Sequence, residues 1–179
     1  MEKLYIYKYD SPIGTLTVAS DGHGITGLWT KNEPFIENDD TIQEVTAKEL
    51  AIFEQTRRWL DAYFAGKDPG FIPPVKTEGT EFRESIWKIL CEIPHGQVIT
   101  YGDIAKRIAL QTGKAKMSSQ AVGGAVGSNP ISIIIPCHRV VGRKGALTGY
   151  AGGIDVKARL LEIEGHDMCK FNNQHQKEG

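Results

Sequence analysis

Alternating apolar and polar residues mark the beginning of the chain. Residues 4–9, 15–20 and 25–30 each follow the two-residue period of a β-strand with one buried face. Turn-forming segments that contain Gly14 and Gly22 separate the three runs. The pattern therefore predicts a three-stranded antiparallel meander.

A helical period replaces this alternation between residues 46 and 64. Large apolar side chains recur there at helical spacing: Leu50, Phe53, Trp59, Leu60 and Tyr63. Residues 66–79 follow and are rich in proline and glycine, as interdomain linkers are. We predict an N-terminal domain over residues 1–79, built from a small antiparallel sheet and a helix.

Helix caps organise the second half of the chain. Thr80 opens a helix that Pro94 stops, and Thr100 opens a shorter one with Asp103 in the capping-box position. Ser118 precedes a further helix over residues 120–127. Two short helices joined by a turn and followed by a strand resemble a helix-turn-helix with a wing. With a final helix that Asp155 caps and Gly165 closes, the fold class is α+β, with a C-terminal domain over residues 80–168 and a polar tail over 169–179.

An apolar run leads directly to a cysteine followed by a histidine and an arginine. Residues 131–135 are predicted to form a buried strand that ends at Pro136, directly before Cys137, His138 and Arg139. Cationic neighbours lower the pKa of a thiol and favour the nucleophilic thiolate. The residues alone allow a structural cysteine, a cysteine hydrolase that uses Cys137 and His138, or another nucleophilic cysteine.

The charge of the chain is unevenly distributed. Residues 1–80 carry 8 basic and 13 acidic side chains, whereas residues 98–159 carry 9 basic and 2 acidic ones. The positive block surrounds Cys137 and is typical of a surface that binds a polyanion, although a solvated lysine-rich face has the same signature.

The helix predicted at residues 120–127 contains Gly123, Gly124 and Gly127. Each glycine costs up to about 1 kcal/mol relative to alanine inside a helix. A helix that carries this cost has a reason to lack side chains on part of its surface. The reason is either close packing on a neighbour or close approach to a DNA backbone. Because long side chains that read the major groove are missing, the minor groove fits better.

Cysteine use and hydropathy place the protein in the cytoplasm. Cys91, Cys137 and Cys169 are odd in number and far apart, which indicates neither a disulfide framework nor a zinc site. The chain has no apolar stretch long enough to span a membrane and no signal-peptide core near its first residue. We expect no metal, no cofactor and no membrane partner.

Glu164 lies in the last turn of the final predicted helix, where the helix dipole disfavours a carboxylate. Solvation would offset this cost, and so would a buried partner such as a histidine.

The segment Pro136-Cys137-His138-Arg139-Val140 resembles the active-site signature of the methylated-DNA–protein-cysteine methyltransferases, the O6-alkylguanine-DNA alkyltransferases. The resemblance covers nearly the whole second half of the chain, in the family's order. Its other elements are 93–96 with Thr100-Tyr101, 121–125, Asn129-Pro130, and 149–153 through Glu164. It implies a ribonuclease H-like N-terminal domain and a C-terminal domain that carries the active site.

The activity that this resemblance implies is DNA repair by direct reversal of damage. An alkyl group would move from O6 of guanine, or less readily O4 of thymine, onto Cys137, and each molecule would act once. Glu164 would orient His138, which would reach Cys137 through a water. The partner is double-stranded DNA bound through its minor groove by a monomer, with the damaged base flipped out.

The same resemblance assigns roles to further positions. Tyr101 would crowd the 3′ phosphate and donate a proton to the leaving guanine, and Asn129 would act as a hinge. The carbonyls of Cys137 and Val140 would accept from the guanine amino group. The remaining DNA-binding or base-binding positions are Arg139, Tyr150, Ala151, Ala121, Gly124 and Gln120.

The chain departs from the family pattern at a few positions. Gln120 replaces the arginine that often fills the vacated base stack, and Ala151 lacks a hydroxyl found in some relatives. No counterpart of the zinc cysteines of some relatives is present in the first half. Alkyltransferase-like proteins bind lesions without a reactive cysteine, and this alternative is disfavoured by the presence of Cys137, His138 and Glu164.

Overall fold

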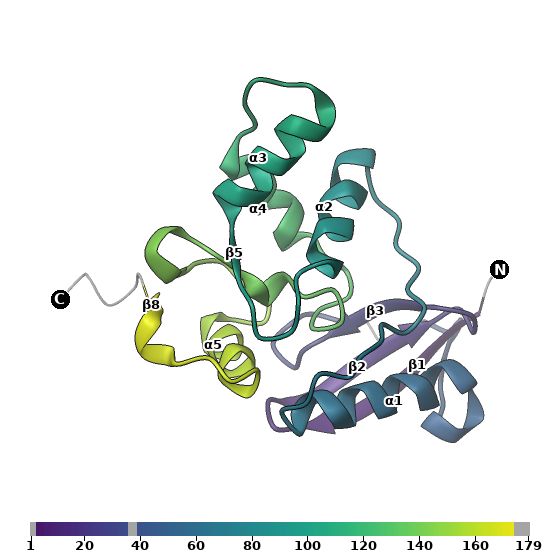
Figure 1. The fold of residues 1–179 in the computed structure, drawn as a ribbon. Coiled ribbons are helices and arrows are strands. Elements are labelled where there is room, and N and C mark those ends of the chain that lie inside the picture. The colour runs from purple at the N-terminus through teal and green to yellow at the C-terminus, as the bar shows by residue number, and fades with distance from the viewer. Residues whose placement is uncertain (1–2, 36–38, 174–179) are drawn as a thin grey trace. The chain divides into compact units, whose positions relative to one another are not determined.

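The computed structural model describes residues 3–35 and 39–173 (Figure 1). The chain divides into two compact units. The first comprises the described residues of Met1–Thr77 together with Pro130–Ile134, and the second those of Glu78–Asn129 together with Ile135–Gly179. Residues 130–134, which we assigned to the C-terminal domain, thus pack within the first unit. The predicted α+β fold class is confirmed.

The first unit contains a four-stranded sheet in the order β3-β2-β1-β4. Its strands are β1 (Leu4–Ser11), β2 (Gly14–Ser20), β3 (Ile25–Trp29) and β4 (Ile42–Glu44). The predicted antiparallel meander is confirmed by β1, β2 and β3. Strand β4 pairs with β1 in parallel and was missed, because its three residues are polar or partly exposed and show no alternation.

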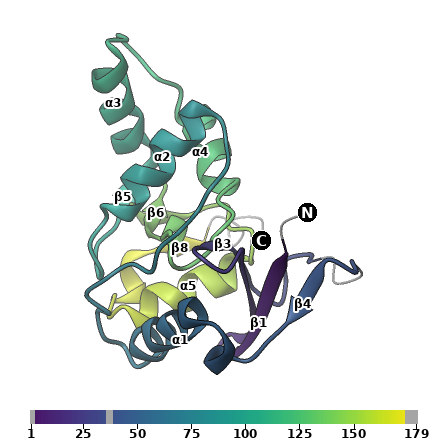
Figure 2. The ribbon, with the colours of Figure 1, turned by 90° about the vertical axis from the view of Figure 1, so that its right-hand side faces the viewer.

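Helix α1 (Ala51–Phe64) lies along one face of this sheet (Figure 2). It begins later than predicted, because Thr46 caps a separate 3₁₀ turn, Ala47–Glu49, and Leu50 is extended. Phe53 is fully buried, with its ring centroid 5.6 Å from that of Tyr7 on β1. The apolar face of α1 therefore supplies the core of the first unit.

The segment after α1 is an ordered strap, although its composition predicted a linker. The indole nitrogen of Trp59 donates to the Phe71 carbonyl at 2.7 Å. Ile25 exchanges backbone hydrogen bonds with Pro74 and Lys76, each 2.8 Å long. Proline and glycine suit this path because they permit tight bends.

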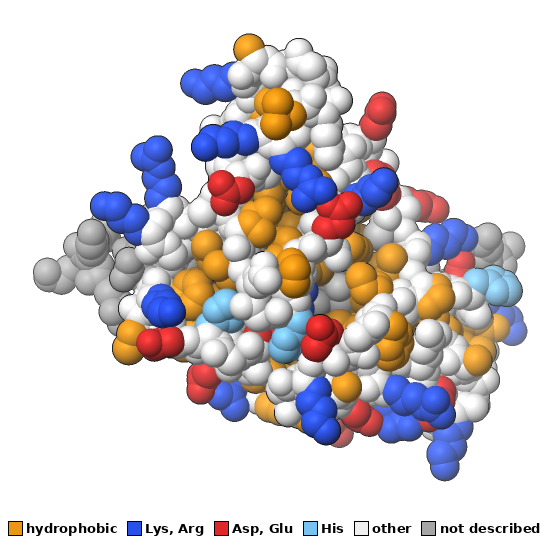
Figure 3. Space-filling view, in the orientation of Figure 1, with side chains coloured by type: hydrophobic (Ala, Val, Ile, Leu, Met, Phe, Trp, Pro, Cys, Tyr) orange, Lys and Arg blue, Asp and Glu red, His pale blue; other side chains and the backbone are white. Residues whose placement is uncertain are grey.

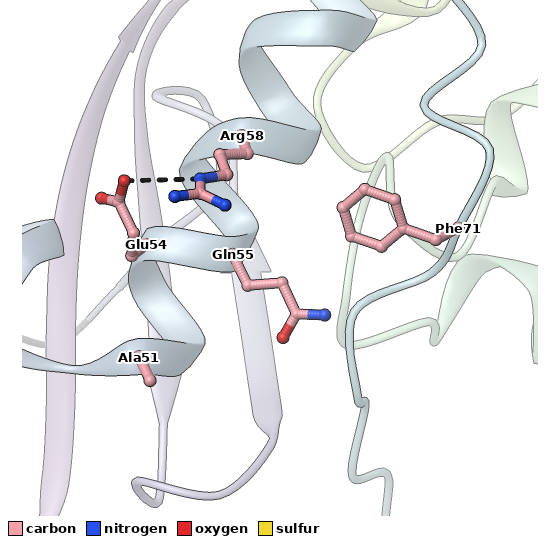
Figure 4. A pocket seen from close by; sticks show the side chains of 5 residues that line it. All are labelled: Ala51, Glu54, Gln55, Arg58 and Phe71. Atoms are coloured by element: carbon pink, nitrogen blue, oxygen red, sulfur yellow. Dashed lines mark ion pairs between the residues drawn. The ribbon is translucent and has the colours of Figure 1, made fainter.

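A shallow pocket of about 490 Å³ lies between α1 and this strap (Figure 4). Glu54 and Arg58 line it as an ion pair, with N–O separation 3.6 Å. The remaining lining residues are Ala51, Gln55 and Phe71. No candidate site residue lies in this pocket.

The second unit is built mainly from helices: α2 (Glu81–Cys91), α3 (Tyr101–Thr112), α4 (Ser119–Gly127) and α5 (Ile154–Ile163). The predicted caps Thr80, Thr100 and Ser118 are confirmed, since each hydroxyl accepts from a backbone N–H in the first turn. Asp155 was predicted to cap α5, but it lies inside the first turn, after Gly153. Trp87 on α2 donates to the Ala125 carbonyl on α4 at 2.9 Å. Because the caps are local signals, the sequence alone located the starts of α2, α3 and α4.

The second unit also contains two pairs of short parallel strands. Strand β5 (Ile99–Thr100) pairs with β6 (Val140–Val141), and β7 (Ala146–Leu147) pairs with β8 (Asn172–Asn173). The predicted polar tail from residue 169 is therefore wrong for residues 169–173. The 3₁₀ turn Met168–Lys170 precedes β8, and Phe171 packs on a cluster of Val141, Leu147 and Leu161. Residues 174–179 of that predicted tail lie outside the described residues.

The predicted strand over residues 131–135 is wrong, although its burial is confirmed. Ile131 forms an isolated β-bridge with Leu28, and the chain then turns. Ile133 has a φ of +71°, a conformation that costs energy for a β-branched residue. Tight i to i+2 hydrogen bonds, from Ile134 to Ser132 and from Cys137 to Ile135, replace the ladder.

Within the described residues, no helix is both long and apolar enough to cross a membrane.

Candidate active site

Cys137 opens a short 3₁₀ turn, Cys137–Arg139, that presents consecutive side chains in different directions. Its backbone N–H donates to the Ile135 carbonyl at 2.8 Å, and its own carbonyl accepts from Val140. The residue is 8 % exposed. The thiol is thus held in a fixed place inside the second unit with little contact with solvent.

His138, the residue after Cys137, forms a buried pair with Glu164. The Nε2 atom of His138 is hydrogen-bonded to Oε2 of Glu164, and both side chains are fully buried. Glu164 follows the last residue of α5, so the end of that helix positions the carboxylate. Of the two alternatives for this carboxylate, solvation or a buried partner such as a histidine, the structure shows the buried partner.

Glu164 is held by two further donors. Arg139 Nε donates to Oε1 at 2.7 Å, and the Gly96 backbone N–H donates to the same oxygen at 3.1 Å. Gly96 has a φ of +79°, which a residue with a side chain rarely adopts. Burial by itself raises the pKa of Glu164, but the His138 hydrogen bond, Arg139 and Gly96 outweigh it and hold the pKa well below its usual range.

An ionised Glu164 determines which nitrogen of His138 carries the proton. The carboxylate accepts from Nε2, so Nε2 bears the hydrogen in the neutral ring and Nδ1 is the basic atom. Burial lowers the pKa of His138, against the opposing effect of Glu164. A neutral, oriented imidazole is a suitable general base.

Arg139, which the family resemblance predicted among the DNA-binding or base-binding residues, is buried. It is 7 % exposed, and its guanidinium is shared between Glu164 and the Ile93 carbonyl, 2.7 Å from Nη1. Its function in the structure is to fix and neutralise the buried carboxylate.

Tyr101, the first residue of α3, points its hydroxyl at the loop before α5. The Oη atom donates to the Thr148 carbonyl at 3.0 Å. Burial raises the pKa of Tyr101, so its phenol stays protonated at neutral pH and can act as a donor. Tyr150 and Ala151 lie in the same loop, where Tyr150 is half-buried and Ala151 is exposed.

Lys157 was missed by the sequence analysis. It is fully buried on α5, and its Nζ donates to the Thr148 carbonyl at 3.0 Å. Burial lowers its pKa to about 8. A signal was present, because Lys157, Leu160, Leu161 and Glu164 follow the i, i+3, i+4, i+7 spacing of a single helix face.

The candidate DNA-binding residues of α4 lie on its exposed side. Gln120, Ala121 and Gly124 are exposed, and a Cβ built at Gly124 meets nothing within 4 Å. Close packing on a neighbour therefore does not explain Gly124. Asn129 follows α4, and its amide donates to the Ile135 carbonyl at 2.7 Å, whereas Val140 is fully buried.

Exposed basic side chains lie on α3 and on the loop that leads to α4. Figure 3 shows Lys and Arg side chains projecting from the region that carries α3 and the α3–α4 loop. The exposed basic residues there are Lys106, Arg107, Lys114 and Lys116. Across residues 3–35 and 39–173, no group of three His, Cys, Asp or Glu side chains is placed to hold a metal ion.

Comparison with known proteins defines the class to which this fold and site belong. Residues 4–77 match the model of the 6-O-methylguanine DNA methyltransferase ribonuclease-like domain, and residues 81–166 match the DNA binding domain of the same proteins. The chain thus combines a ribonuclease-like domain with a DNA-binding domain.

Similar proteins share nearly the full length of the chain. Methylated-DNA–protein-cysteine methyltransferases of Haemophilus influenzae and Methanosarcina acetivorans are 42% and 44% identical, over 92% and 90% of this chain and 88% and 99% of theirs. The structure of Mycobacterium tuberculosis OGT in complex with DNA is 38% identical with a TM-score of 0.76, over 89% of this chain and 92% of that chain. The chain therefore belongs to the methylated-DNA–protein-cysteine methyltransferase family, as its signature predicted.

Proposed function

We propose that this protein repairs DNA by transferring an alkyl group from O6 of guanine to Cys137. The observation that carries the proposal is the buried, ionised Glu164 bonded to His138, the residue next to Cys137. A protein that only binds lesions has no use for this arrangement. The thioether formed at Cys137 is stable, because removal of its alkyl group would require displacement of a thiolate from an unactivated carbon, so each molecule acts once.

The chemistry follows from the geometry of the pair. Glu164 holds the Nε2 hydrogen of His138, and Nδ1 accepts the proton of the Cys137 thiol through a water. The thiolate attacks the alkyl carbon, so that an S–C bond forms while the C–O6 bond breaks. The electron pair of the broken bond leaves with guanine, to which Tyr101 donates a proton, and the histidine proton restores the phenol through solvent.

The substrate in this proposal is a duplex bound through its minor groove by a protein monomer in the cytoplasm. The exposed small residues of α4 support close approach to the DNA backbone. Helices α3 and α4 would act as the helix-turn-helix, and Gln120 would occupy the gap left by the flipped base. The carbonyls of Cys137 and Val140 would receive the guanine amino group, while Tyr150 and Ala151 line the pocket and Asn129 supports the turn between α4 and Cys137.

Intact-protein mass spectrometry with a duplex that carries one O6-methylguanine tests this function. We expect one added methyl group per protein, located on the Cys137 peptide, and no further reaction. Cys137→Ala is expected to bind the duplex without gaining mass, and Cys91→Ala is the control that keeps the transfer. Binding by the unaltered protein without any mass change would contradict alkyl transfer and indicate a lesion-binding protein.

Glu164→Gln tests the orienting role. An amide cannot hold the His138 tautomer with a full negative charge, so we expect transfer to slow by at least about tenfold. Duplex binding should be unchanged. Single-turnover rates measured by quenched flow would contradict the assignment if they matched those of the unaltered protein.

A further inference from the structure

Lys157 is a buried cation that the proposed mechanism leaves without a role. Its side chain projects from α5 into the interior of the second unit and is fully buried. Nζ donates to the backbone carbonyls of Thr148 and Gly149, at 3.0 and 3.4 Å. In the part of the chain that the structure describes, no carboxylate pairs with it, so its positive charge is not neutralised.

The Thr148 carbonyl receives two donors at once. Tyr101 Oη from α3 and Lys157 Nζ from α5 each lie 3.0 Å from this oxygen. Nζ also lies 5.9 Å from the centre of the Tyr101 ring. One lysine thus contacts both the loop that continues to Tyr150 and Ala151 and the tyrosine that would donate the proton.

Lys157 lies close to the groups proposed to react. Helix α5, which carries Lys157, packs against the Cys137–Arg139 turn, and its Nζ lies beside the Tyr101 ring of α3. Of the titratable groups on these neighbouring elements, Tyr101, Cys137 and His138 interact with Lys157. A thiolate at Cys137 and the Lys157 ammonium stabilise each other, and the same ammonium disfavours protonation of His138. In a site with little water, an uncompensated cation has a stronger effect than it would have at the surface.

We propose that Lys157 is a positioning residue for the reaction of Cys137: its ammonium fixes the Thr148–Gly149 carbonyls below the Tyr101 hydroxyl and supplies positive charge that favours the thiolate. The inference rests on the proposed role of Cys137 as the alkyl acceptor. A purely structural lysine would hold the loop without influencing the ionisation of the thiol.

Three substitutions separate the charge from the hydrogen bonds. Lys157→Met removes both, Lys157→Gln keeps an amide donor without charge, and Lys157→Arg keeps the charge. Lys88→Met, at an exposed lysine on α2, is the matched control. The first readout is the rate at which iodoacetamide alkylates Cys137 as a function of pH, followed by peptide mass spectrometry. The second is single-turnover transfer from the O6-methylguanine duplex.

We expect the midpoint of the alkylation profile to rise by about one pH unit in Lys157→Met and Lys157→Gln. Transfer near neutral pH should fall roughly tenfold with it. Lys157→Arg should keep a midpoint near that of the unaltered protein, and Lys88→Met should change neither readout.

Two results would overturn the inference. One is an unchanged midpoint in both uncharged variants, whether or not transfer slows. The other is an equal change in all three Lys157 variants, because that pattern reports lost packing and not lost charge. The iodoacetamide profile needs no DNA, so it tests Lys157 even if the unaltered protein accepts no methyl group from the duplex.

Discussion

At the scale of single residues, the second unit buries two charged groups, Glu164 and Lys157. Among the residues that the structure describes, opposite charges neutralise the first of them but not the second. Glu164 accepts from His138, Arg139 and Gly96, whereas in the described part of the chain Lys157 interacts with backbone carbonyls and the Tyr101 ring and with no carboxylate. Removing a partner from a buried ion costs far more than removing a surface charge. The two groups therefore predict opposite changes in stability.

Arg139→Met should destabilise the protein. It leaves the Glu164 carboxylate buried without its guanidinium, which costs about 3 kcal/mol or more. Urea denaturation at neutral pH measures the change, with the exposed Arg143→Met as control. Equal free energies of unfolding for the two variants would show that Arg139 does not compensate this charge.

Lys157→Met should stabilise the protein near neutral pH while it slows transfer. The folded-state pKa of Lys157 is lowered from 10.5 to about 8, so the buried charge costs about 3 kcal/mol below pH 8. Loss of the carbonyl hydrogen bonds offsets about 1 kcal/mol of this gain.

The pH dependence of this gain has a definite sign. Between pH 8 and 10.5 the unfolded chain binds more protons at Lys157 than the folded protein, so the unaltered protein gains stability as pH rises. The advantage of Lys157→Met should shrink across that window. Denaturation curves at the two ends of the window measure it, and a constant difference would contradict a titrating Lys157.

At the scale of elements, α4 combines poor helix propensity with an open surface. Its glycines weaken the helix, and Gly124 has no neighbour that would exclude a side chain. Close approach of another molecule to α4 would explain why these glycines are present despite their low helix propensity. Stability and DNA binding should therefore respond in opposite ways to larger residues at this position.

Gly124→Ala and Gly124→Leu test this relation. Both should raise the free energy of unfolding by up to about 1 kcal/mol through helix propensity. Binding of a duplex, measured by fluorescence anisotropy, should weaken progressively and by more than about tenfold for leucine, because the side chain enters the proposed contact with the backbone. Iodoacetamide reactivity of Cys137 should stay constant as a control, and full-strength binding by Gly124→Leu would place the DNA elsewhere.

At the scale of the whole molecule, stability should decline on the acid side in two stages. Burial lowers the pKa of His138 and of His166, so the unfolded chain takes up more protons below about pH 6.5 and stability falls. The pKa of Glu164 is also held low, so its contribution is present above about pH 4.3 and is lost at lower pH.

Thermal denaturation across this pH range checks both stages. Glu164→Gln should reduce the second stage, because an amide does not titrate, and should leave the first stage from the histidines. Part of the second stage should persist, because the pKa values of Asp21 and Asp103 are also lowered in the folded protein. A variant whose profile parallels that of the unaltered protein below pH 4.3 would contradict the ionised, buried Glu164.

The chain by itself determined the features that depend on neighbours in sequence. The caps at Thr80, Thr100 and Ser118 and the two-residue alternation of β1 to β3 are local signals, and each located its element. The order of residues in the signature was sufficient to indicate the family and the candidate site, since the signature consists of residues adjacent in sequence.

The tertiary structure alone decided which buried groups meet. The turn at Ile133, the short edge strand β4, the strap at residues 71–76 and the strand β8 all depend on partners distant in sequence. Arg139 faces Glu164 and not the surface, and Lys157 enters the interior because α5 turns that face inward. Sequence patterns specify which faces are buried, but the partner of a buried charge is determined only when distant elements pack together and exclude water.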